Sequence, residues 1–543
     1  MNEAQHSPWK KRTPWVVGGT ALLLLLLRIL PYQTAELGSE KNHFLGFAYS
    51  IEDSLQYADF VAQGREGKIL LSNHFTLAKE DPRLIILPLS FIGRMAKVFG
   101  LSVAGAWQLA HALLILAFVL VWFWFLGAFF PSPGTRLFAF AFVLLAGGLD
   151  GWVVLFGDFW PAAWQPVLKK ALWPVLGWTP GMTMYNPLYL AGWLALLPML
   201  RWLIEALNGK RVASWLVGLS LPLLYLVHAY DASVLVAIIC LLPLHPLLIR
   251  LETGQAKTVL RQVLPALAGL PAVALLAWWM LGDPLFAQTV AQSNSGLFIS
   301  PLLWLLGFGG ILLAAAYGLR RMGEASPRAM LLFAWLSTSA ALSFSPFFEG
   351  RHFLYFVSLP LGIVAVDGLL WLKKRLALGR KATVVVMVLG LLVFGNSLLR
   401  VAQRGFGVHN HDHRLYAHKA ELQMAEYMKT LPEGGVLCSR QTGNWLPHRS
   451  GRRVVMGHWF MTPDLAQQTH RFRLLVSPKT SPKTRDKLLL ASKARYLFWG
   501  PREEALGARP SPHHVRLLPL KKIGPVFLLE IRPPPAQQIP IAP

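Results

Sequence analysis

Two adjacent carboxylates, Glu52 and Asp53, lie in the first long polar stretch after an N-terminal apolar segment. A carboxylate that is partly withdrawn from water can accept a proton, so this pair indicates chemistry at the outer surface of a membrane. Consecutive residues of a helix do not face one site together, and we expect one carboxylate to point at a reacting centre and the other away. The alternative is that both cap a helix N-terminus or lie in solvent.

A second group of polar residues, His228, Tyr230 and Asp231, falls at the junction of two apolar segments. Polar side chains at the edge of a bilayer are costly unless they are used or paired, so we expect them to line the wall of a cleft. The alternative is structural: Asp231 caps the next helix and His228 satisfies a backbone carbonyl.

Long apolar segments must position these residues. The 543 residues are 54% hydrophobic and only 15% charged, with a mean hydropathy of +0.44, which is rare in a soluble protein. A bilayer crossing needs roughly 20 apolar residues, and about eleven such segments can be drawn. The sequence therefore predicts an α-helical polytopic membrane protein, with spans near residues 15–30, 103–129, 137–156, 188–204, 213–227, 232–249, 263–281, 302–319, 329–344, 353–372 and 383–399.

The distribution of lysine and arginine predicts the orientation of the chain. With the N-terminus on the cytoplasmic side, almost all basic residues of the short loops lie inside, and the short outer loops hold only Lys169, Lys170 and Arg351. No small-residue cleavage site follows the first apolar segment, so we expect it to remain as an anchor. These observations predict a multi-pass protein of the cytoplasmic (inner) membrane whose C-terminal segment is external.

Three regions lie outside the spans. Residues 31–107 form a long external loop, with one helix predicted over 49–61 and an interfacial helix over 82–97. Residues 157–185 are rich in Trp and Pro and are predicted to be an interfacial loop. Residues 1–400 are thus expected to form the transmembrane domain, residues 401–532 a small external α/β domain, and residues 533–543 a disordered tail. Within the α/β domain, a helix is predicted over 419–430 and strands over 435–439, 453–457, 494–499 and 525–531.

The formal charge of +25 points to lipid phosphates, not to nucleic acid. Part of it is the loop bias described above, and from Val401 onward 22 Lys and Arg face 9 Asp and Glu. No basic stripe interleaved with aromatic residues marks a nucleic-acid-binding fold, so we expect no nucleic-acid partner. The two cysteines, Cys240 and Cys438, lie in a span and in the tail and predict neither a disulfide nor a thiolate metal site.

The order of these motifs resembles the GT-C superfamily of polyprenyl-phosphate-dependent membrane glycosyltransferases, which includes protein mannosyltransferases and aminoarabinose transferases. The likeness covers nearly the whole chain, although each motif is short. The residues that carry it are Glu52-Asp53 with Tyr57 and Asn73, His228-Ala229-Tyr230-Asp231, Arg351-His352 with Pro360-Leu361, and Gly457-His458-Trp459.

The resemblance implies transfer of a hexosyl or pentosyl group from a polyprenyl-phosphate donor to a lipid, glycan or protein acceptor on the external face. An acidic residue in the first external loop of this family acts as general base or holds a divalent metal; Asp53 is the position assigned here, with Glu52 as competitor. A phosphate leaving group needs cations, and Arg351 is the leading candidate because it stands alone in a short outer loop. Its alternatives are an ion pair with Glu349 or contact with lipid headgroups, while His352 and His458 are weaker candidates for substrate contact.

A divalent metal ion is left open. Some relatives bind metal through carboxylates of a second loop, which makes Asp150 and Asp158 weak candidates, although no tight Asp-x-Asp pair is present. The run His409, His411, Asp412 and His413 has spacings that allow shared metal binding, but a solvated linker is the commoner explanation of such a run.

Two other classes of protein fit parts of the pattern. A transporter or flippase of lipid-linked envelope precursors also has many spans, but its ionisable residues usually lie near the middle of helices, where this chain has mainly Asp367. A membrane scaffold needs no long amphipathic first loop. Within the enzyme class, a polysaccharide polymerase or ligase stays open.

Overall fold

The computed structural model describes residues 8–37, 42–79, 81–145, 161, 186–250, 252–293, 301–320, 324, 326–344, 350–377, 379, 413–513 and 515–533. The chain divides into two compact units, and each is described by itself. The first unit holds residues 1–31, 109–278 and 294–407; the second holds residues 32–108, 279–293 and 408–543.

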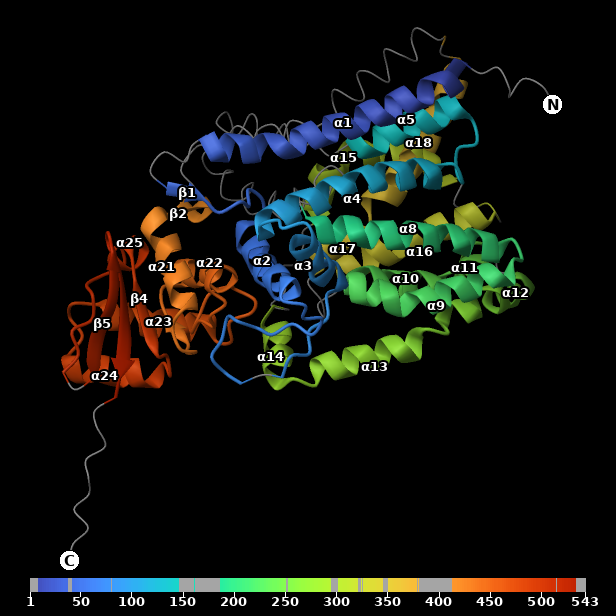
Figure 1. The fold of residues 1–543 in the computed structure, drawn as a ribbon. Coiled ribbons are helices and arrows are strands. Elements are labelled where there is room, and N and C mark those ends of the chain that lie inside the picture. The colour runs from blue at the N-terminus through green and yellow to red at the C-terminus, as the bar shows by residue number, and fades with distance from the viewer. Residues whose placement is uncertain are drawn as a thin grey trace, which may run out of the picture. The chain divides into compact units, whose positions relative to one another are not determined.

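The first unit is a bundle of apolar helices (Figure 1). Within it α15 packs along α18, α8 along α9, and α10 along α16. Its core is filled by large side chains such as Trp122, Trp193 and Trp335, none of which is exposed by more than 1%. The helices that belong to it wholly or in part are α1 (Pro8–Leu37), α4 (Val103–Leu126), α5 (Pro133–Leu145), α8 (Pro187–Leu207), α9 (Arg211–Val227), α10 (Ala229–Leu241), α11 (Leu244–Arg250), α12 (Thr253–Val263), η3 (Leu264–Leu267), α13 (Leu270–Leu281), α15 (Pro301–Gly318), α16 (Pro327–Ser343), α17 (Arg351–Leu354) and α18 (Ser358–Arg375).

Local sequence explains where two of these helices begin. Asn186 precedes α8, and its side-chain oxygen accepts a hydrogen bond from the backbone N–H of Leu188. Ser326 caps α16 in the same way, accepting from Ala329 N. In both helices proline follows the cap, where its fixed φ suits the first turn and its missing N–H leaves nothing unpaired.

Four helices in the described part of the chain are long and apolar enough to cross a membrane: Arg12–Leu37, Val103–Leu126, Pro187–Leu207 and His352–Arg375. A fifth crossing results if the pair Thr253–Leu267 and Leu270–Leu281, bent by 46°, counts as one span. Length and composition therefore make the chain a multi-pass membrane protein, as the sequence predicts, while the number of about 11 spans stays a prediction.

Proline alters two of the predicted spans. The segment 232–249 is divided between α10 and α11, and Pro243 stands at the break. The segment 263–281 bends between η3 and α13, which contain Pro265 and Pro271. A proline removes one backbone hydrogen bond and clashes with the preceding turn, which accounts for both interruptions. The end of the segment 137–156, the segment 383–399, most of the Trp-rich loop and nearly all of the predicted tail lie outside the described residues.

The second unit combines the first long loop with the C-terminal segment. β1 (Asn42–Phe44) pairs antiparallel with β2 (Tyr416–His418), which joins residues from opposite ends of the sequence. A four-stranded sheet has the order β3-β4-β6-β5, formed by β3 (Val436–Leu437), β4 (Tyr496–Trp499), β5 (Arg516–Ile523) and β6 (Val526–Arg532). The remaining elements are α2 (Ile51–Arg65), α3 (Leu87–Val98), α14 (Pro284–Ser293), η5 (His413–Leu415), α21 (Lys419–Lys429), α22 (Arg440–Ser450), α23 (Leu465–Val476), α24 (Pro482–Ala491) and α25 (Pro501–Glu504).

This architecture confirms the helix predicted over 419–430 and the strands over 435–439, 494–499 and 525–531. The segment 453–457 forms only an isolated bridge, between Val454 and Val436. Both helices predicted in the first loop are present, as α2 and α3. The domain boundaries predicted at residues 400 and 532 stay a prediction.

α2 and α3 pack so closely that glycine is required at their crossing. A Cβ atom on Gly93 would lie 2.4 Å from the carbonyl oxygen of Val61, and one on Gly64 would lie 2.8 Å from Ser90 Cα. Neither helix can move away easily, because Phe60, Val61, Leu89 and Ile92 are buried. The crossing therefore fixes α2, the helix that carries Glu52 and Asp53.

Candidate functional site

Glu52 and Asp53 lie in the first turn of α2. Ser50, the residue before the first residue of α2, has a left-handed backbone conformation with φ 40°, and its side chain does not cap the helix. The N-terminus of a helix carries a partial positive charge that favours nearby carboxylates. Both carboxylates therefore lie at a helix N-terminus, as the capping alternative predicts, but they have different partners.

Asp53 is held by two ring nitrogens of the C-terminal segment. Its Oδ1 atom lies 3.0 Å from His458 Nε2 and accepts a hydrogen bond of 3.1 Å from Trp459 Nε1. The backbone N–H of Phe460 donates to His458 Nδ1 at 3.3 Å, which leaves the ring proton on Nε2, facing Asp53. The His458 side chain is 2% exposed, whereas that of Asp53 is 39% exposed. The carboxylate is therefore oriented by fixed donors and still open to a reactant.

Glu52 is paired with arginine. Arg440 Nη2 donates to Glu52 Oε2 at 2.6 Å, and Arg414 lies 3.8 Å from the other carboxylate oxygen. The side-chain amide of Asn444 donates to the Glu52 carbonyl at 3.3 Å. The carboxylate oxygens of Glu52 are thus taken up by arginine partners, so this geometry favours Asp53 over Glu52 as the residue that meets a reactant.

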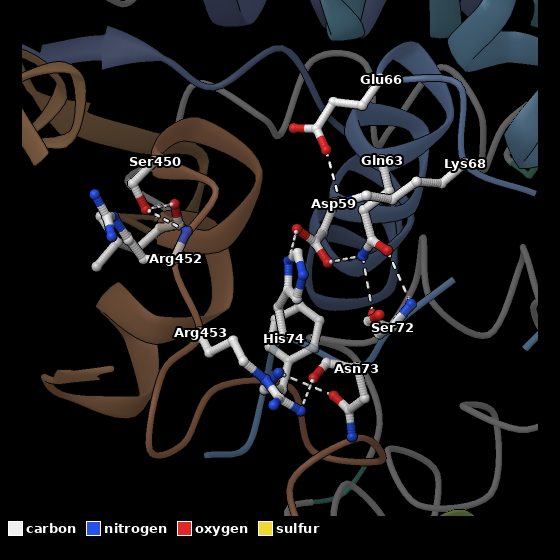
Figure 2. Close-up of polar contacts among 12 residues, drawn as sticks. Asp59, Gln63, Glu66, Lys68, Ser72, Asn73, His74, Ser450, Arg452 and Arg453 are labelled. Atoms are coloured by element: carbon white, nitrogen blue, oxygen red, sulfur yellow. Dashed lines mark hydrogen bonds and ion pairs between the residues drawn. The ribbon is translucent and has the colours of Figure 1, made fainter. Parts of the chain in front are cut away.

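A polar network around Asp59 joins α2 to the chain that follows it (Figure 2). Asp59 is 1% exposed; its two carboxylate oxygens lie 2.9 Å from His74 Nδ1 and 2.9 Å from Gln63 Nε2. Gln63 also bonds to the backbone N–H and C=O of Ser72, at 2.8 and 2.9 Å. These contacts fix residues 72–74 against α2.

The same network reaches the segment that carries His458. Asn73 Nδ2 donates to the carbonyl of Met461 at 2.8 Å, and Arg453 donates to the carbonyl of Asn73 at 3.1 Å (Figure 2). The hydroxyl of Thr462 donates to the Phe75 carbonyl at 3.1 Å. Asn73, one of the residues that carry the sequence resemblance, thus positions the chain beside Asp53 and does not contact Asp53 itself in any of these bonds.

His228, Tyr230 and Asp231, the second predicted group, lie in the first unit. His228, between α9 and α10, bonds through Nδ1 to the carboxylate of Asp231, which is completely buried. Tyr230 stacks on His352, with ring centroids 4.7 Å apart and planes 20° apart. Tyr189 meets the His228 ring edge to face at 5.2 Å. This aromatic and histidine cluster contains four of the predicted site residues. The structural alternative expected a backbone carbonyl as the partner of His228 and Asp231 as a helix cap, whereas His228 bonds to the Asp231 carboxylate and Asp231 lies in the first turn of α10.

The remaining predicted residues lie outside the described side chains. Asp150 and Asp158, and the metal candidates His409, His411 and Asp412, lie outside the described residues. Arg351 begins α17, but its side chain is likewise not described. Among the residues that the structure does describe, no group of three His, Cys, Asp or Glu side chains could hold a metal ion.

Three buried side chains of the second unit have shifted pKa values. Burial raises the pKa of Glu421, against the opposing effect of Arg502. Burial, reinforced by the charge of Glu503, raises the pKa of the Cys438 thiol well above its usual value, so this cysteine is a poor nucleophile. Burial also lowers the pKa of His448 well below 6.5, with a smaller contribution from Arg449. None of these groups supplies the orienting contacts of Asp53.

Comparison with solved structures finds proteins of similar fold. The oligosaccharyltransferase of Archaeoglobus fulgidus, in a crystal structure with zinc and sulfate, matches 89% of this chain and 67% of its own, at 12% identity and a TM-score of 0.53. Its apo form matches 89% of this chain and 69% of its own, at 11% identity and a TM-score of 0.52. The chain shares the overall fold of this oligosaccharyltransferase. This confirms, for the fold, the resemblance found in the sequence.

ArnT of Cupriavidus metallidurans, bound to undecaprenyl phosphate, matches 94% of this chain and 98% of its own, at 14% identity and a TM-score of 0.46. No protein-family model matches the sequence. No curated protein matches it either.

Sequence reasoning missed the contacts that Trp459 and Arg440 make. Trp459 was grouped with His458, but its indole N–H gave no sign of a bond to a residue 406 positions away. Arg440 looked like one of many basic residues in the tail.

Proposed function

We propose that this protein is an integral membrane glycosyltransferase that takes a sugar from a polyprenyl-phosphate donor and transfers it to an acceptor on the external face. Asp53 is its general base. The observation that carries the proposal is the carboxylate of Asp53, 39% exposed and held by His458 and Trp459. The shared fold with an oligosaccharyltransferase supports the reaction class.

The chemistry follows from the reactants. An oxygen of the acceptor attacks the anomeric carbon of the sugar, the bond from that carbon to the phosphate oxygen breaks, and the phosphate keeps the bonding electrons. The proton of the acceptor hydroxyl passes to Asp53. Positioned general bases of this kind contribute about 10²–10⁴-fold to the rate. His458 and Trp459 act as positioning residues, because their N–H groups fix one carboxylate oxygen and leave the side chain accessible.

No step is assigned to a metal ion. The oligosaccharyltransferase structure contains zinc, but Asp53 has one histidine beside it and Glu52 is occupied by arginines, so the described residues do not form a metal site. A requirement for a divalent ion is tested by chelation of the purified enzyme, followed by addition of single metals.

The aromatic and histidine cluster is assigned to donor binding as a further part of the proposal. Tyr230 and His352 present stacked rings, and Arg351 directly precedes His352 in the sequence. Arginine can meet a phosphate through two parallel hydrogen bonds. If these residues bind the donor, His352→Gln and Arg351→Gln raise KM for the lipid-linked sugar more than they lower kcat; an unchanged KM contradicts the assignment.

The decisive experiment compares the lipid-linked sugars and envelope glycans of cells that carry the intact protein, no protein, or Asp53→Asn. Asparagine keeps an oxygen that can accept from His458 and Trp459, so folding is expected to persist while the base is lost. Asp81→Asn is the matched control, because that carboxylate lies in the same loop with its side chain 85% exposed. Loss of one sugar and accumulation of its carrier-bound donor with Asp53→Asn, but not with Asp81→Asn, supports the proposal. Unchanged glycans in every strain would return the transporter or scaffold hypothesis to first place.

A further inference from the structure

One short segment, residues 72–75, holds the loop that supplies both ring nitrogens bonded to the proposed base. We call that loop, residues 453–462, the His458 loop. At its start, the backbone N–H of Val454 donates to the carbonyl of His74 at 2.8 Å. The segment that follows α2 in the sequence is therefore bonded directly to the loop that follows α22.

The other end of the His458 loop is fixed by Phe75. The carbonyl of Phe75 accepts a hydrogen bond of 3.1 Å from the Thr462 hydroxyl, which itself accepts one of 3.0 Å from Gly457 N. The backbone N–H of Thr462 donates to the carbonyl of His458 at 3.1 Å. Phe75 is completely buried, and its ring centroid lies 6.0 Å from that of His458. A shift of Phe75 would therefore be passed on to the imidazole that holds Asp53.

The segment 72–75 is itself attached to α2 by the buried side chain of Asp59 (Figure 2). One carboxylate oxygen of Asp59 meets His74 Nδ1 and the other accepts from Gln63, each at 2.9 Å. Buried polar groups whose hydrogen bonds are all made favour a single geometry. Asp59 and Asp53 belong to the same helix, about 9 Å apart along its axis at 1.5 Å per residue.

These bonds form a closed path through the second unit. The path runs from Asp53 along α2 to Asp59, through His74 to the His458 loop, and back to Asp53 through His458. Catalytic groups must be held to within roughly 0.5 Å of their productive geometry, and supporting hydrogen bonds provide that restraint. The contact between Asp59 and His74 is the step at which this path leaves α2.

We propose that Asp59 and His74 are positioning residues for the transfer reaction. Their contact sets the place of the His458 loop relative to α2, and so keeps the N–H groups of His458 and Trp459 on one oxygen of Asp53. The inference rests on the proposed function. If the pair served stability alone, its loss would lower Tm without changing the rate of the enzyme that remains folded.

Hydrogen–deuterium exchange tests the link without turnover. Purified full-length protein in phosphatidylcholine nanodiscs is compared with Asp59→Asn, and the peptides that cover residues 453–462 are followed by mass spectrometry. Asparagine offers one acceptor oxygen to the two donors that share Asp59, so one bond is lost. Exchange in these peptides is expected to rise about fivefold or more, as a local loss of about 1 kcal/mol would produce.

Asp486→Asn is the matched control for exchange. Asp486 is also a buried carboxylate of the second unit, 6% exposed, but it accepts backbone hydrogen bonds from the chain just before β5. Exchange in residues 453–462 is expected to stay as in the intact protein. An equal rise in both variants, or no rise in Asp59→Asn, overturns the inference.

Sugar transfer tests the role in catalysis. The probe is the lipid-linked donor extracted from Asp53→Asn cells, and membranes of cells that lack the protein supply the acceptor. His74→Leu is expected to lower kcat about 10- to 100-fold while KM for the donor changes less than about threefold, because a small misplacement of a catalytic group lowers the rate of reaction. His74→Asn is expected to keep most of the rate, since its amide nitrogen is as many bonds from the backbone as Nδ1. A lower Tm with unchanged kcat in His74→Leu overturns the inference.

A double-mutant cycle tests the route of the effect. Trp459→Phe and His74→Leu both act on the contacts of Asp53, so together they are expected to lower kcat by less than the product of their single effects. A loss equal to that product would show that the two substitutions act independently, and would contradict a path from His74 to Asp53.

The two proposals can fail separately. If Asp53→Asn leaves glycans unchanged, the proposed function fails, and the role of Asp59 and His74 in transfer fails with it. If Asp53→Asn abolishes transfer while His74→Leu changes neither exchange in residues 453–462 nor kcat, the proposed function stands and the positioning role fails.

Discussion

His448 makes the stability of the second unit depend on pH. It lies on α22, packs edge to face against Phe47 at 6.2 Å, and is so buried that its pKa falls well below 6.5. In the unfolded chain the same side chain titrates near its usual value of about 6.5. A lowered pKa in the folded state means that stability is fully present above pH 6.5 and is lost as the pH falls below it.

The magnitude follows from this difference. At pH 5.5 the unfolded chain gains roughly 1 kcal/mol by protonating His448, and the folded chain gains less because burial holds the pKa of the imidazole below its usual value. At pH 7.5 the unfolded chain gains almost nothing. For a unit of this size, a loss of up to roughly 1 kcal/mol corresponds to a decrease in Tm of roughly 2–4 °C.

The assay compares the Tm at pH 7.5 and 5.5 for the intact protein and for His448→Met. Methionine is apolar, does not titrate and adapts to irregular cavities, so this variant is expected to lose less of its Tm between the two pH values. His470→Gln, at an exposed histidine of the same unit, is expected to behave like the intact protein. Equal losses for the intact protein and His448→Met would refute the reasoning, because the pH dependence would then come from other groups.

Three further substitutions test the positioning of α2 and its carboxylate. Trp459→Phe keeps an aromatic ring but removes the N–H that bonds to Asp53, so kcat is expected to fall about 10- to 150-fold with little change in Tm, as measured by sugar transfer and thermal unfolding; an unchanged kcat contradicts the role. Asp59→Asn removes the charge of the buried carboxylate that pairs with His74 and is expected to cost about 1–3 kcal/mol in unfolding free energy, measured against the exposed Asp81→Asn. Gly93→Ala places a Cβ 2.4 Å from the Val61 carbonyl and is expected to lower stability by about 1–3 kcal/mol, whereas Gly254→Ala, with no atom within 4 Å, has no such effect; equal Tm values for the two would show that α2 and α3 are not tightly packed.

The sequence predicted those helices and strands that are marked by the composition or spacing of their own residues. Apolar segments long enough to cross a bilayer needed only composition, and α2 followed from apolar residues at helical spacing. The strand β6 was visible because residues 526–529 form an apolar run that follows a Gly-Pro turn signal. The strand β5 was missed, since Lys521 and Lys522 and the irregularity beside Pro519 give it the polar pattern of an edge strand.

The candidate site was only partly predictable for a related reason. Asp53 and His458 were each selected from their sequence context, but nothing local indicates that they contact each other across 405 residues. The arginines around Glu52 carry no periodicity that distinguishes them from the basic residues elsewhere in the tail. Such pairings are decided by tertiary packing, which a single sequence does not display.

The pairing of the first loop with the C-terminal segment has a consequence for biosynthesis. Asp53 leaves the ribosome 405 residues before His458, and Asn42 of β1 leaves it 376 residues before His418, its partner in β2. At synthesis rates of about 5–20 residues per second, the loop spends roughly 20–80 s without its partners. During that interval the apolar face that later packs on the C-terminal segment is open to proteases and chaperones. Premature termination of translation would therefore leave a chain in which Asp53 has never met His458 and Trp459.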